Sequence, residues 1–271
     1  MDSKICVWNS TATGVPSPIC IDLLGHVGSI SLLDHIGSMI ISASYDKTIR
    51  CWQSSGKKSF TDSVVLKGHG APILAMAVTE SGCVASGARN GEVRVWDINT
   101  QKSIRNVSSA HDGHVTALLW DREESNTFVW SGGQDGCVKQ WDVRARAPIQ
   151  SLPLHQNSAG RGALAEMQYT SSGKLVTAGA DGILHVIDPR VASKPLFRFT
   201  EHGDFIYSLH VKNELIFSGA SDGMLHVHDA SLGKLLYGLG ANQAAVRCIG
   251  TTKEHLIAAG DDGTVLVYNM P

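Results

Sequence analysis

The sequence of 271 residues lacks paired cysteines, a block of basic residues and an apolar run long enough to cross a bilayer. Its six cysteines are scattered without a CxxC pair, so we expect neither a disulfide framework nor a zinc site. The net charge is −2, and without concentrated Lys and Arg we expect no sequence-independent binding to phosphates. The chain does not open with a charged and then apolar signal segment. These absences favour a reducing compartment, and we expect the cytosol or the nucleus.

Aromatic residues are few, at 6%, whereas 28 glycines are available for tight turns. Against this background one pattern recurs seven times: an acidic or amide residue is followed six positions later by the last large residue of an apolar segment. The pairs are Asp2/Trp8, Asp46/Trp52, Asn90/Trp96, Asp135/Trp141, Asp181/Ile187, Asp222/His228 and Asp262/Tyr268. Successive pairs are 40 to 46 residues apart, which is the period of a β-propeller blade with four short strands.

The second repeat shows the four strands most clearly. Short apolar or β-branched segments cover Ile30–Leu33, Met39–Ala43, Thr48–Trp52 and Ser63–Leu66, and polar or glycine residues bound each of them. This pattern predicts consecutive antiparallel hairpins. The turn before the third strand recurs as Asn90-Gly91, Asp135-Gly136, Asp181-Gly182, Asp222-Gly223 and Asp262-Gly263. Such dipeptides are favoured in tight hairpins because their residues tolerate positive φ.

These motifs resemble the WD40 repeat family. The resemblance is carried by Val7-Trp8-Asn9, Val95-Trp96-Asp97, Gln140-Trp141-Asp142, Gly25-His26 and Gly68-His69. It implies an all-β propeller of four-stranded antiparallel blades, in which every blade needs its neighbours to cover its faces. We therefore expect one domain over residues 1–271. Its repeat units are expected at about 1–25 (partial), 26–68, 69–110, 111–154, 155–201, 202–241 and 242–271.

In this family a His, a hydroxyl, an Asp and a Trp form a hydrogen-bonded network inside one blade. The resemblance implies the sets His26/Ser42/Asp46/Trp52, His111/Ser131/Asp135/Trp141 and, with an amide in place of the carboxylate, His69/Ser86/Asn90/Trp96. Such a network is reasonable because a buried imidazole and a buried indole N–H both need partners. Units five to seven lose members of the set. Ile187, His228 and Tyr268 replace the Trp, and Ala258 replaces the hydroxyl residue of the last unit.

Ser, His and Asp together also suggest a catalytic triad. A nucleophile is normally unique, however, whereas this set recurs at constant offsets from unit to unit. We therefore expect a structural role for the repeated set and no enzymatic activity.

The first residues align with the middle of a repeat, since Met1 corresponds to Tyr45. Two architectures follow from this register. The chain is either a seven-bladed propeller with an N-terminally truncated first blade, or a six-bladed ring closed by the strand near Ile19 with an extra N-terminal strand. The first is favoured because Asp2 and Trp8 require a His and a Ser of their own blade. An unclosed ring would also expose sheet edges.

The expected function is that of a non-catalytic protein-interaction scaffold that binds through its loop faces. The partners expected are other proteins or peptides, with no small-molecule substrate, no specific nucleic acid, no membrane, no metal and no cofactor. Tyr, Arg and Phe side chains on one rim are typical interface anchors. The candidate partner-binding residues of this top face are Tyr45, Arg89, Gln134, His114, Arg161, Phe205 and Asp261.

A second function remains open on the opposite face. Trp141-Asp142-Val143-Arg144 resembles the Trp-Asp-x-Arg motif of WD40 substrate receptors of cullin-4 ubiquitin ligases, and Ile187-Asp188-Pro189-Arg190 keeps its Asp and Arg. A guanidinium at a strand end can make bidentate contacts that Lys cannot. Arg144 and Arg190 are therefore candidate adaptor-binding residues, although Gln140 departs from the apolar residue of the receptor pattern.

Overall fold

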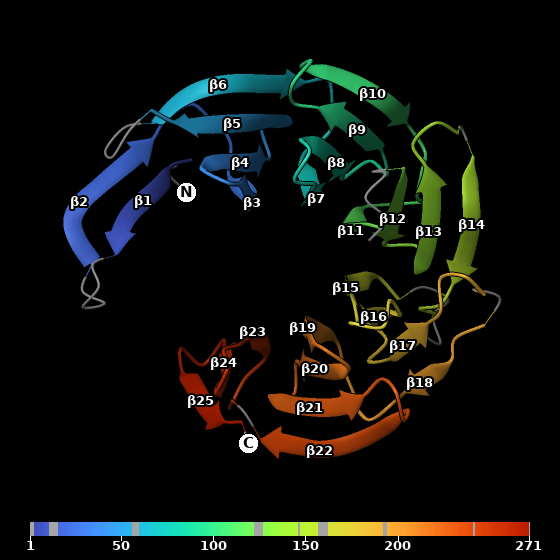
Figure 1. Cartoon of the computed structure of the whole chain (residues 1–271). Coiled ribbons are helices and arrows are strands. Elements are labelled where there is room, and N and C mark those ends of the chain that lie inside the picture. Colours follow the sequence, from blue (N-terminus) through green and yellow to red (C-terminus); the bar gives the residue numbers. More distant parts are fainter. Residues whose placement is uncertain are drawn as a thin grey trace. The chain divides into compact units, whose positions relative to one another are not determined.

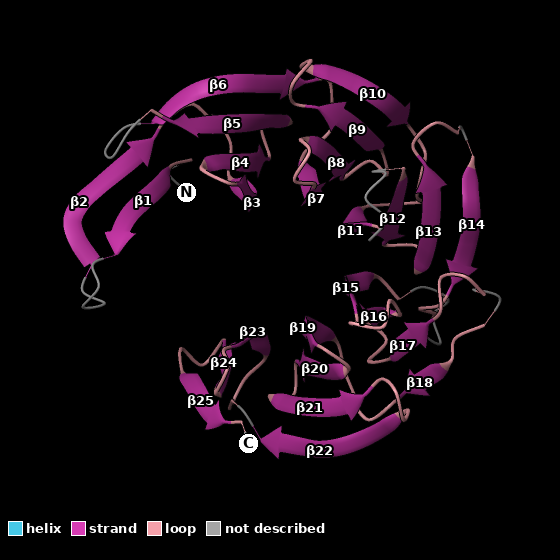
Figure 2. Ribbon diagram, in the orientation of Figure 1, coloured by secondary structure: helices cyan, strands magenta, loops and turns pink. Residues whose placement is uncertain are grey.

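The computed structural model of the chain describes residues 3–10, 16–55, 60–121, 127–145, 147–156, 162–191, 194–240 and 242–270. Every regular element in these ranges is a β-strand (Figure 2). The contacts divide the chain into two compact units. Unit 1 comprises Met1–Val129 and Asp142–Arg146, and unit 2 comprises Trp130–Trp141 and Ala147–Pro271.

Unit 1 contains a hairpin, two complete sheets and one further strand (Figure 1). Its strands are β1 (Ile5–Ser10), β2 (Pro16–Leu23), β3 (Ile30–Ile36), β4 (Met39–Ser44), β5 (Thr48–Ser54), β6 (Phe60–Lys67), β7 (Ile73–Val78), β8 (Cys83–Ala88), β9 (Val93–Asp97), β10 (Lys102–Val107) and β11 (Val115–Trp120). The strands β3–β6 and β7–β10 follow one another across each sheet in sequence order, and neighbours run antiparallel. Strand β12 (Phe128–Gly133) crosses the boundary between the units.

Unit 2 contains the paired strands β13 and β14, two complete sheets and a final three-stranded sheet (Figure 1). Its strands are β13 (Cys137–Asp142, whose last residue belongs to unit 1), β14 (Pro148–Pro153), β15 (Leu164–Tyr169), β16 (Leu175–Gly179), β17 (Leu184–Ile187), β18 (Phe197–Phe199), β19 (Ile206–Lys212), β20 (Leu215–Ala220), β21 (Met224–Asp229), β22 (Lys234–Gly240), β23 (Val246–Thr251), β24 (His255–Gly260) and β25 (Val265–Asn269). All pairings within these sheets are antiparallel between strands consecutive in sequence.

The predicted all-β class with four-stranded antiparallel blades is confirmed by these sheets. The glycines of the five predicted turns have φ between 71° and 80°, the left-handed region in which a Cβ is disfavoured. Lys47 occupies the same turn position in sheet β3–β6 with φ 71° and is the one non-glycine residue among these six turns. The number of blades, six or seven, stays a prediction.

Apolar side chains fill the space between successive sheets within each unit. In unit 1, Ile41 and Ile49 of sheet β3–β6 pack with Ile73 and Trp96 of sheet β7–β10. In unit 2, a buried cluster joins sheet β15–β18 to β19–β22, and a second joins β19–β22 to β23–β25. Each sheet therefore has a side that only its neighbour covers, as expected for blades that cannot bury their faces alone.

Polar side chains also join the innermost strands of neighbouring sheets. In unit 1, Trp120 Nε1 donates to the carbonyl of Ala77 at 3.0 Å. In unit 2, the Glu166 carboxylate accepts from the backbone N–H of Leu209 at 3.0 Å, and Gln168 bonds the same strand. Burial raises the pKa of Glu166, although its hydrogen bonds oppose that effect. These links fix the alignment of one inner strand against the next.

We predict that Trp52→Ala lowers the free energy of unfolding by about 3–5 kcal/mol, because it leaves a cavity in a packed site. Trp52 is only 2% exposed and packs with Ile5 and Leu23 of the β1–β2 hairpin. Tyr268→Ala is the matched control and should cost clearly less, since Tyr268 is partly exposed. Urea unfolding followed by circular dichroism measures both. Equal losses for the two variants would contradict the prediction.

Candidate functional site

A buried hydrogen-bonded network lies in sheet β3–β6. Trp52 Nε1 donates to Ser42 Oγ at 2.8 Å, and Ser42 Oγ lies 2.8 Å from His26 Nε2. The other imidazole nitrogen, Nδ1, lies 2.7 Å from the Asp46 carboxylate. Because a carboxylate only accepts, His26 Nδ1 carries the proton, and Nε2 accepts from the Ser42 hydroxyl. One ordered chain of donors thus runs from the indole to the carboxylate.

The Asp46 carboxylate is ionised within this network. Burial alone would raise its pKa, but hydrogen bonds from Thr48, His26 and the backbone lower it overall. Thr48 Oγ1 donates to the second carboxylate oxygen at 2.6 Å. Asp46 therefore anchors both the loop that carries His26 and the turn into β5.

Sheet β7–β10 departs from the expected set in one residue. His69 Nε2 lies 2.6 Å from Ser86 Oγ, and Trp96 Nε1 donates to the same oxygen at 2.7 Å. The partner of His69 Nδ1 is Glu92, at 2.8 Å, and not Asn90. The prediction that Asn90 takes the carboxylate position is wrong.

The physical reason for this difference is reach. Glu92 starts two residues later than Asn90, and its longer side chain extends back to His69. The Asn90 side-chain oxygen instead accepts from the backbone N–H of Glu92 at 3.3 Å, closing the turn. Burial would raise the pKa of Glu92, but hydrogen bonds from His69 and Arg94 lower it overall. The charge of the network is therefore kept by a different residue.

The third expected set is divided between the units. In unit 2, Trp141 Nε1 donates to Ser131 Oγ at 2.7 Å, and Asp135 Oδ1 accepts from the backbone N–H of Cys137. His111 is buried in unit 1.

Sheet β15–β18 keeps most of the network although Ile187 stands at the Trp position. His155 Nε2 lies 2.9 Å from Thr177 Oγ1, and Nδ1 lies 3.0 Å from Asp181. Burial of Asp181 would raise its pKa, but the hydrogen bond from His155 lowers it overall. The ring of His185 meets His155 edge-on at a centroid distance of 5.0 Å.

Sheet β19–β22 replaces the indole by two further histidines. His202 Nε2 lies 2.8 Å from Ser218 Oγ, and its ring lies against His226 at a centroid distance of 4.3 Å. His226 meets His228 edge-on at 6.0 Å. All three rings are buried, and no Nδ1 of the three has a hydrogen-bond partner among the described residues.

Burial in this histidine cluster disfavours the charged imidazolium. Burial, followed by the charge of His226, lowers the pKa of His202 to about 4. Burial also lowers the pKa of His228. In sheet β15–β18, burial is the larger cause and the charge of His155 the next that lower the pKa of His185 to about 4. Burial therefore favours the neutral form of His185, His202 and His228 in unit 2.

In the final sheet an asparagine stands at the His position. Asn242 Nδ2 donates to Asp262 Oδ1 at 3.0 Å and to Thr264 Oγ1 at 2.7 Å. The carboxylate also accepts from the backbone N–H groups of Thr264 and Gln243, which together hold the pKa of Asp262 at about 2. The amide keeps the loop attached to the turn without an imidazole.

The structure brings two groups of the candidate top-face residues together. In unit 1, Arg89 Nε lies 3.4 Å from His114 Nε2, and Tyr45 is exposed on the turn between β4 and β5. In unit 2, Gln134 is exposed, whereas Phe205 and Asp261 belong to one cluster described next. Arg161 lies outside the described residues.

That cluster, the aromatic rim of unit 2, consists of Phe205, Tyr207, Arg247 and Asp261. The rings of Phe205 and Tyr207 stack at 4.5 Å, and the Arg247 guanidinium lies 3.8 Å from the centre of the Tyr207 ring. The single Nε–H of Arg247 is shared between the two Asp261 carboxylate oxygens, at 2.8 and 2.9 Å. This pair raises the pKa of Arg247 and lowers that of Asp261, so both remain charged.

The sequence pattern had not singled out Tyr207 and Arg247. Tyr207 is the second residue of the innermost strand β19, and Arg247 is the second residue of the innermost strand β23. Each directly follows a fully buried apolar residue. Strand alternation could have identified this position as outward-facing. Their mutual contact depends on the packing of two sheets and carries no sequence signal.

Arg144 and Arg190 take the same conformation at the ends of β13 and β17. Each guanidinium forms a bidentate pair with the Asp two residues earlier, Asp142 or Asp188, with bonds of 2.8 to 3.0 Å. The Arg144 and Arg190 side chains are 72% and 81% exposed. The hydrogen bonds from Arg190 hold the pKa of Asp188 at about 2. The two arginines are therefore fixed in direction and open to solvent.

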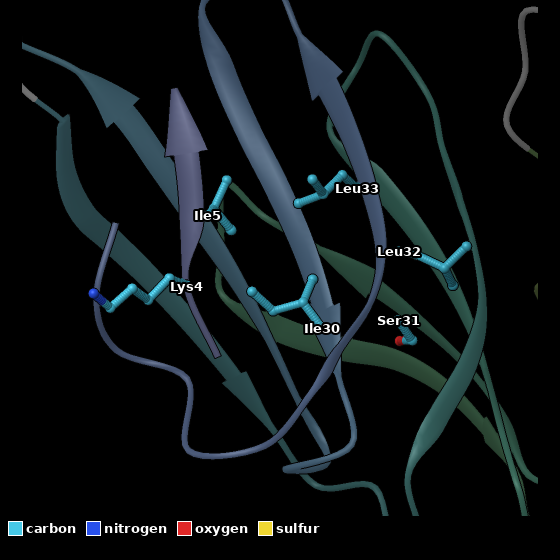
Figure 3. Close-up of a pocket in the computed structure, with 6 residues that line it drawn as sticks. All are labelled: Lys4, Ile5, Ile30, Ser31, Leu32 and Leu33. Atoms are coloured by element: carbon cyan, nitrogen blue, oxygen red, sulfur yellow. The ribbon is translucent and has the colours of Figure 1, made fainter. Parts of the chain in front are cut away.

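Unit 1 also contains a cavity of about 380 Å³ between β1 and β3 (Figure 3). Ile5, Ile30, Leu32 and Leu33 supply most of its apolar lining, and Lys4 lies at one end. Ser31 is the other polar residue of its lining.

Within the described ranges, no three His, Cys, Asp or Glu side chains are arranged to hold a metal ion. The same residues include no helix that could span a membrane.

Two protein-family profiles match the chain. Residues 26–126 match the family described as IP5P C-F beta-propeller, and residues 193–229 match the family described as WD domain, G-beta repeat.

Several curated proteins are similar over longer segments. The Arabidopsis thaliana protein named Cell division cycle 20.4, cofactor of APC complex, is 28% identical over 181 residues, which are 64% of this chain and 39% of that protein. Meiotic fizzy-related protein 1 of Schizosaccharomyces pombe is 29% identical over 216 residues, 76% of this chain and 48% of that protein. Nuclear distribution protein nudF 2 of Penicillium rubens is 33% identical over 97 residues, 33% of this chain and 20% of that protein. The chain thus spans less than half the length of these relatives.

We predict that the stability of the protein falls as the pH is lowered from about 6.5 to 4. A histidine in the unfolded chain has a pKa near 6.5, whereas His185 and His202 have values of about 4 in the fold. Between these values the unfolded state binds more protons, so acid favours unfolding, by on the order of 3 kcal/mol per histidine. Urea unfolding at a series of pH values measures the effect.

His202→Asn supplies the direct test, because Asn242 shows that an amide is tolerated at this position. The variant should have a smaller loss of stability between pH 6.5 and 4 than the wild type. The exposed His35→Asn is the matched control and should leave the pH dependence unchanged. An identical pH dependence in the wild type and His202→Asn would contradict the assignment.

Proposed function

Because this chain is a WD40-repeat protein of the β-propeller class, we propose that it is a non-catalytic scaffold that binds other proteins. The observation that carries this proposal is the aromatic rim of unit 2. Two stacked aromatic rings and an arginine held between a ring and a carboxylate form a pre-ordered surface. Aromatic and arginine side chains are the residue types that supply most binding energy in protein interfaces. Their pre-ordering reduces the entropy lost on binding.

The charges around the rim define the kind of partner. Three further carboxylates lie close to the rim. Asp204 precedes Phe205, and Asp262 follows Asp261. Asp222 follows Ser221, whose backbone N–H donates to the Phe205 carbonyl. Hydrogen bonds hold the pKa of Asp204 low and that of Asp262 at about 2, so both are ionised at neutral pH. The positive charge of Arg247 is already balanced by the carboxylate of Asp261. The surface therefore suits a peptide or protein segment with Lys or Arg next to an apolar residue.

A catalytic use of the repeated Ser, His and Asp is disfavoured by access. Ser42, Ser86 and Ser218 are fully buried, and each hydroxyl is engaged by an imidazole. A nucleophile must reach its substrate, and these hydroxyls have no exposed surface. Their arrangement supports a structural role.

The relatives are consistent with partner binding, since one is named as a cofactor of the APC complex. We propose a location in the cytosol or the nucleus, with proteins or peptides as the partners. Small-molecule substrates, nucleic acids and membranes are not among the partners we propose.

We predict that Tyr207→Ala combined with Arg247→Ala removes partner binding through the rim. Loss of hot-spot residues costs about 2 kcal/mol or more, corresponding to at least about 30-fold weaker binding. Affinity capture from cells with quantitative mass spectrometry would compare the double variant with the wild type. The captured proteins should decrease together, and capture by the wild type should weaken at high salt because the rim is acidic.

Leu232→Ser is the matched control in the same unit, since Leu232 is exposed but lies outside the rim. It should retain the wild-type set of captured proteins. Both substitutions in the rim affect partly exposed side chains, so thermal unfolding should remain near that of the wild type. Unchanged capture by a folded double variant would overturn the rim as the binding surface.

A cullin-4 substrate-receptor role is the second candidate. It is favoured by the fixed, exposed guanidinium groups of Arg144 and Arg190. A pre-oriented guanidinium can exchange its carboxylate partner for one on another protein, or donate a further hydrogen bond to a carbonyl oxygen of that protein. The Arg144 carbonyl is held by the Arg105 guanidinium, which further fixes this strand end.

We predict that Arg144→Ala with Arg190→Ala abolishes binding to the cullin-4 adaptor if the protein is such a receptor, and leaves the rim-dependent partners bound. Pull-down with purified adaptor measures the first effect. Arg144→Lys with Arg190→Lys keeps the charge but not the bidentate geometry and should also bind more weakly. If the wild-type protein does not bind the adaptor, this candidate fails while the scaffold proposal stands.

A further inference from the structure

Unit 1 carries an exposed arginine that is held in direction by an uncharged group. Arg89 lies on the turn between β8 and β9, and its backbone N–H donates to the Pro72 carbonyl at 2.9 Å. The Nε–H of its guanidinium donates to His114 Nε2 at 3.4 Å. Among the described residues, no carboxylate pairs with this guanidinium. Its two terminal nitrogens can therefore donate to an acceptor on another molecule.

This environment distinguishes Arg89 from other arginines of the fold. The guanidinium groups that pair with a carboxylate are those of Arg50, Arg94, Arg144, Arg190 and Arg247. A partner would have to displace that carboxylate before it could use such a group. At Arg89 the orienting imidazole accepts through Nε2, which it does only in its neutral form. The Arg89 guanidinium is thus pre-oriented while its charge remains unbalanced.

The exposed charges of the surrounding loops are mostly positive. Lys47 is exposed on the turn between β4 and β5, and Lys67 is exposed at the end of β6. The carboxylates of the two turns, Asp46 and Glu92, are only 5% and 6% exposed and are engaged in the buried networks. Asp112, in the loop before β11, is an exposed carboxylate among these loops. Positive charge therefore predominates on this part of unit 1.

Exposed apolar side chains lie on the adjacent turn. Tyr45 occupies the position in sheet β3–β6 that Arg89 occupies in sheet β7–β10, since its backbone N–H donates to the Ser29 carbonyl in the loop before β3. Tyr45 is 45% exposed, and Val27 is 89% exposed. Both adjoin Asp46, whose carboxylate accepts from the Val27 N–H at 3.1 Å. The two sheets are neighbours in unit 1 (Figure 1), so apolar surface and an unbalanced guanidinium occur on successive turns.

The equivalent loops of unit 2 have the opposite charge. Their exposed residues include the carboxylates of Glu201, Asp204, Asp222 and Asp261. Arg247 beside them is paired with Asp261. A basic segment that suits the aromatic rim of unit 2 would meet like charge at the loops of unit 1. The two sets of loops therefore select partners of different chemistry.

We propose that a surface of unit 1 formed by Val27, Tyr45, Lys47, Arg89 and His114, the Arg89 surface, binds a protein segment that carries Asp or Glu next to an apolar residue. The carboxylate of the segment accepts two hydrogen bonds from the guanidinium, a bidentate geometry that Lys cannot offer. The apolar residue packs against the exposed tyrosine ring. The charge of Lys47 favours the approach of an acidic segment. Charge complementarity thus decides the occupant, and this surface shares no residue with the aromatic rim.

A display library of random peptides, selected on the immobilised full chain, tests the proposal. Selection is performed in parallel on the wild type and on Arg89→Glu. Peptides retained by the wild type alone should be enriched in Asp and Glu next to an aromatic or aliphatic residue, because a carboxylate at position 89 repels them. Enrichment of Lys and Arg among these peptides would overturn the proposal. So would a library that yields no peptide dependent on Arg89.

A selected acidic peptide then permits an exchange of charges between peptide and protein. Arg89→Ala should bind it at least about ten-fold more weakly than the wild type by fluorescence anisotropy, because the charged pair is lost. Arg89→Lys should bind with intermediate affinity, since it keeps the charge without the bidentate geometry. Arg89→Glu should instead prefer the same peptide with its acidic residue replaced by arginine. If the exchange restores no binding, residue 89 does not meet the carboxylate and the proposal fails.

Arg198→Glu is the matched control, because Arg198 is also exposed but lies on β18 of unit 2. It should bind the acidic peptide as the wild type does. The double variant Tyr207→Ala with Arg247→Ala should also retain this peptide, so that failure of the aromatic rim and failure of the Arg89 surface can be told apart. Circular dichroism should show that the variants at positions 89 and 198 remain folded, since both side chains are exposed. A single-stranded oligonucleotide that binds more tightly than the peptides, and depends on Arg89, would overturn the protein segment as the occupant.

Discussion

In sheets β3–β6 and β7–β10, the fold depends on a buried hydroxyl that has side-chain hydrogen-bond partners on both sides. In sheet β3–β6, Ser42 accepts from the Trp52 indole and donates to the His26 imidazole, which in turn donates to Asp46. The loop before the inner strand, the second strand and the third strand are thereby joined at one point. Removing any member would leave a buried polar group without a partner, which costs more than the bond itself contributes. The network explains why polar residues occupy the centre of otherwise apolar sheets.

The network changes from sheet to sheet without losing its function. Glu92 supplies the carboxylate from a different backbone position, so the charge is retained while the residue moves. In sheet β19–β22 the indole is absent, and His228 stands at its position in contact with His226. In sheets β15–β18 and β19–β22 the geometry survives because the hydroxyl and the first histidine remain. The chemistry differs, since neutral buried histidines make this unit sensitive to acid where unit 1 relies on indole packing.

The surface proposed for unit 2 rests on side chains that are ordered before a partner binds. In the aromatic rim, Tyr207 and Arg247 are held by their mutual contact and by the pairing of Arg247 with Asp261. Side chains fixed in this way lose less entropy when a partner binds.

The repeated pairs of an acidic residue and a strand end determined the blade pattern from sequence alone, because a period of about 40 residues with Asp-Gly turns permits few other folds. The same pattern located the Ser42 and Ser86 networks, since their members stand at constant offsets. It failed at Asn90, where the choice of carboxylate depends on how far a side chain two residues later can reach. It also could not find the Tyr207–Arg247 contact, because those residues come from two sheets and meet only through packing. Local spacing thus determined the strands and turns, whereas tertiary packing alone decided which charged and aromatic side chains face one another.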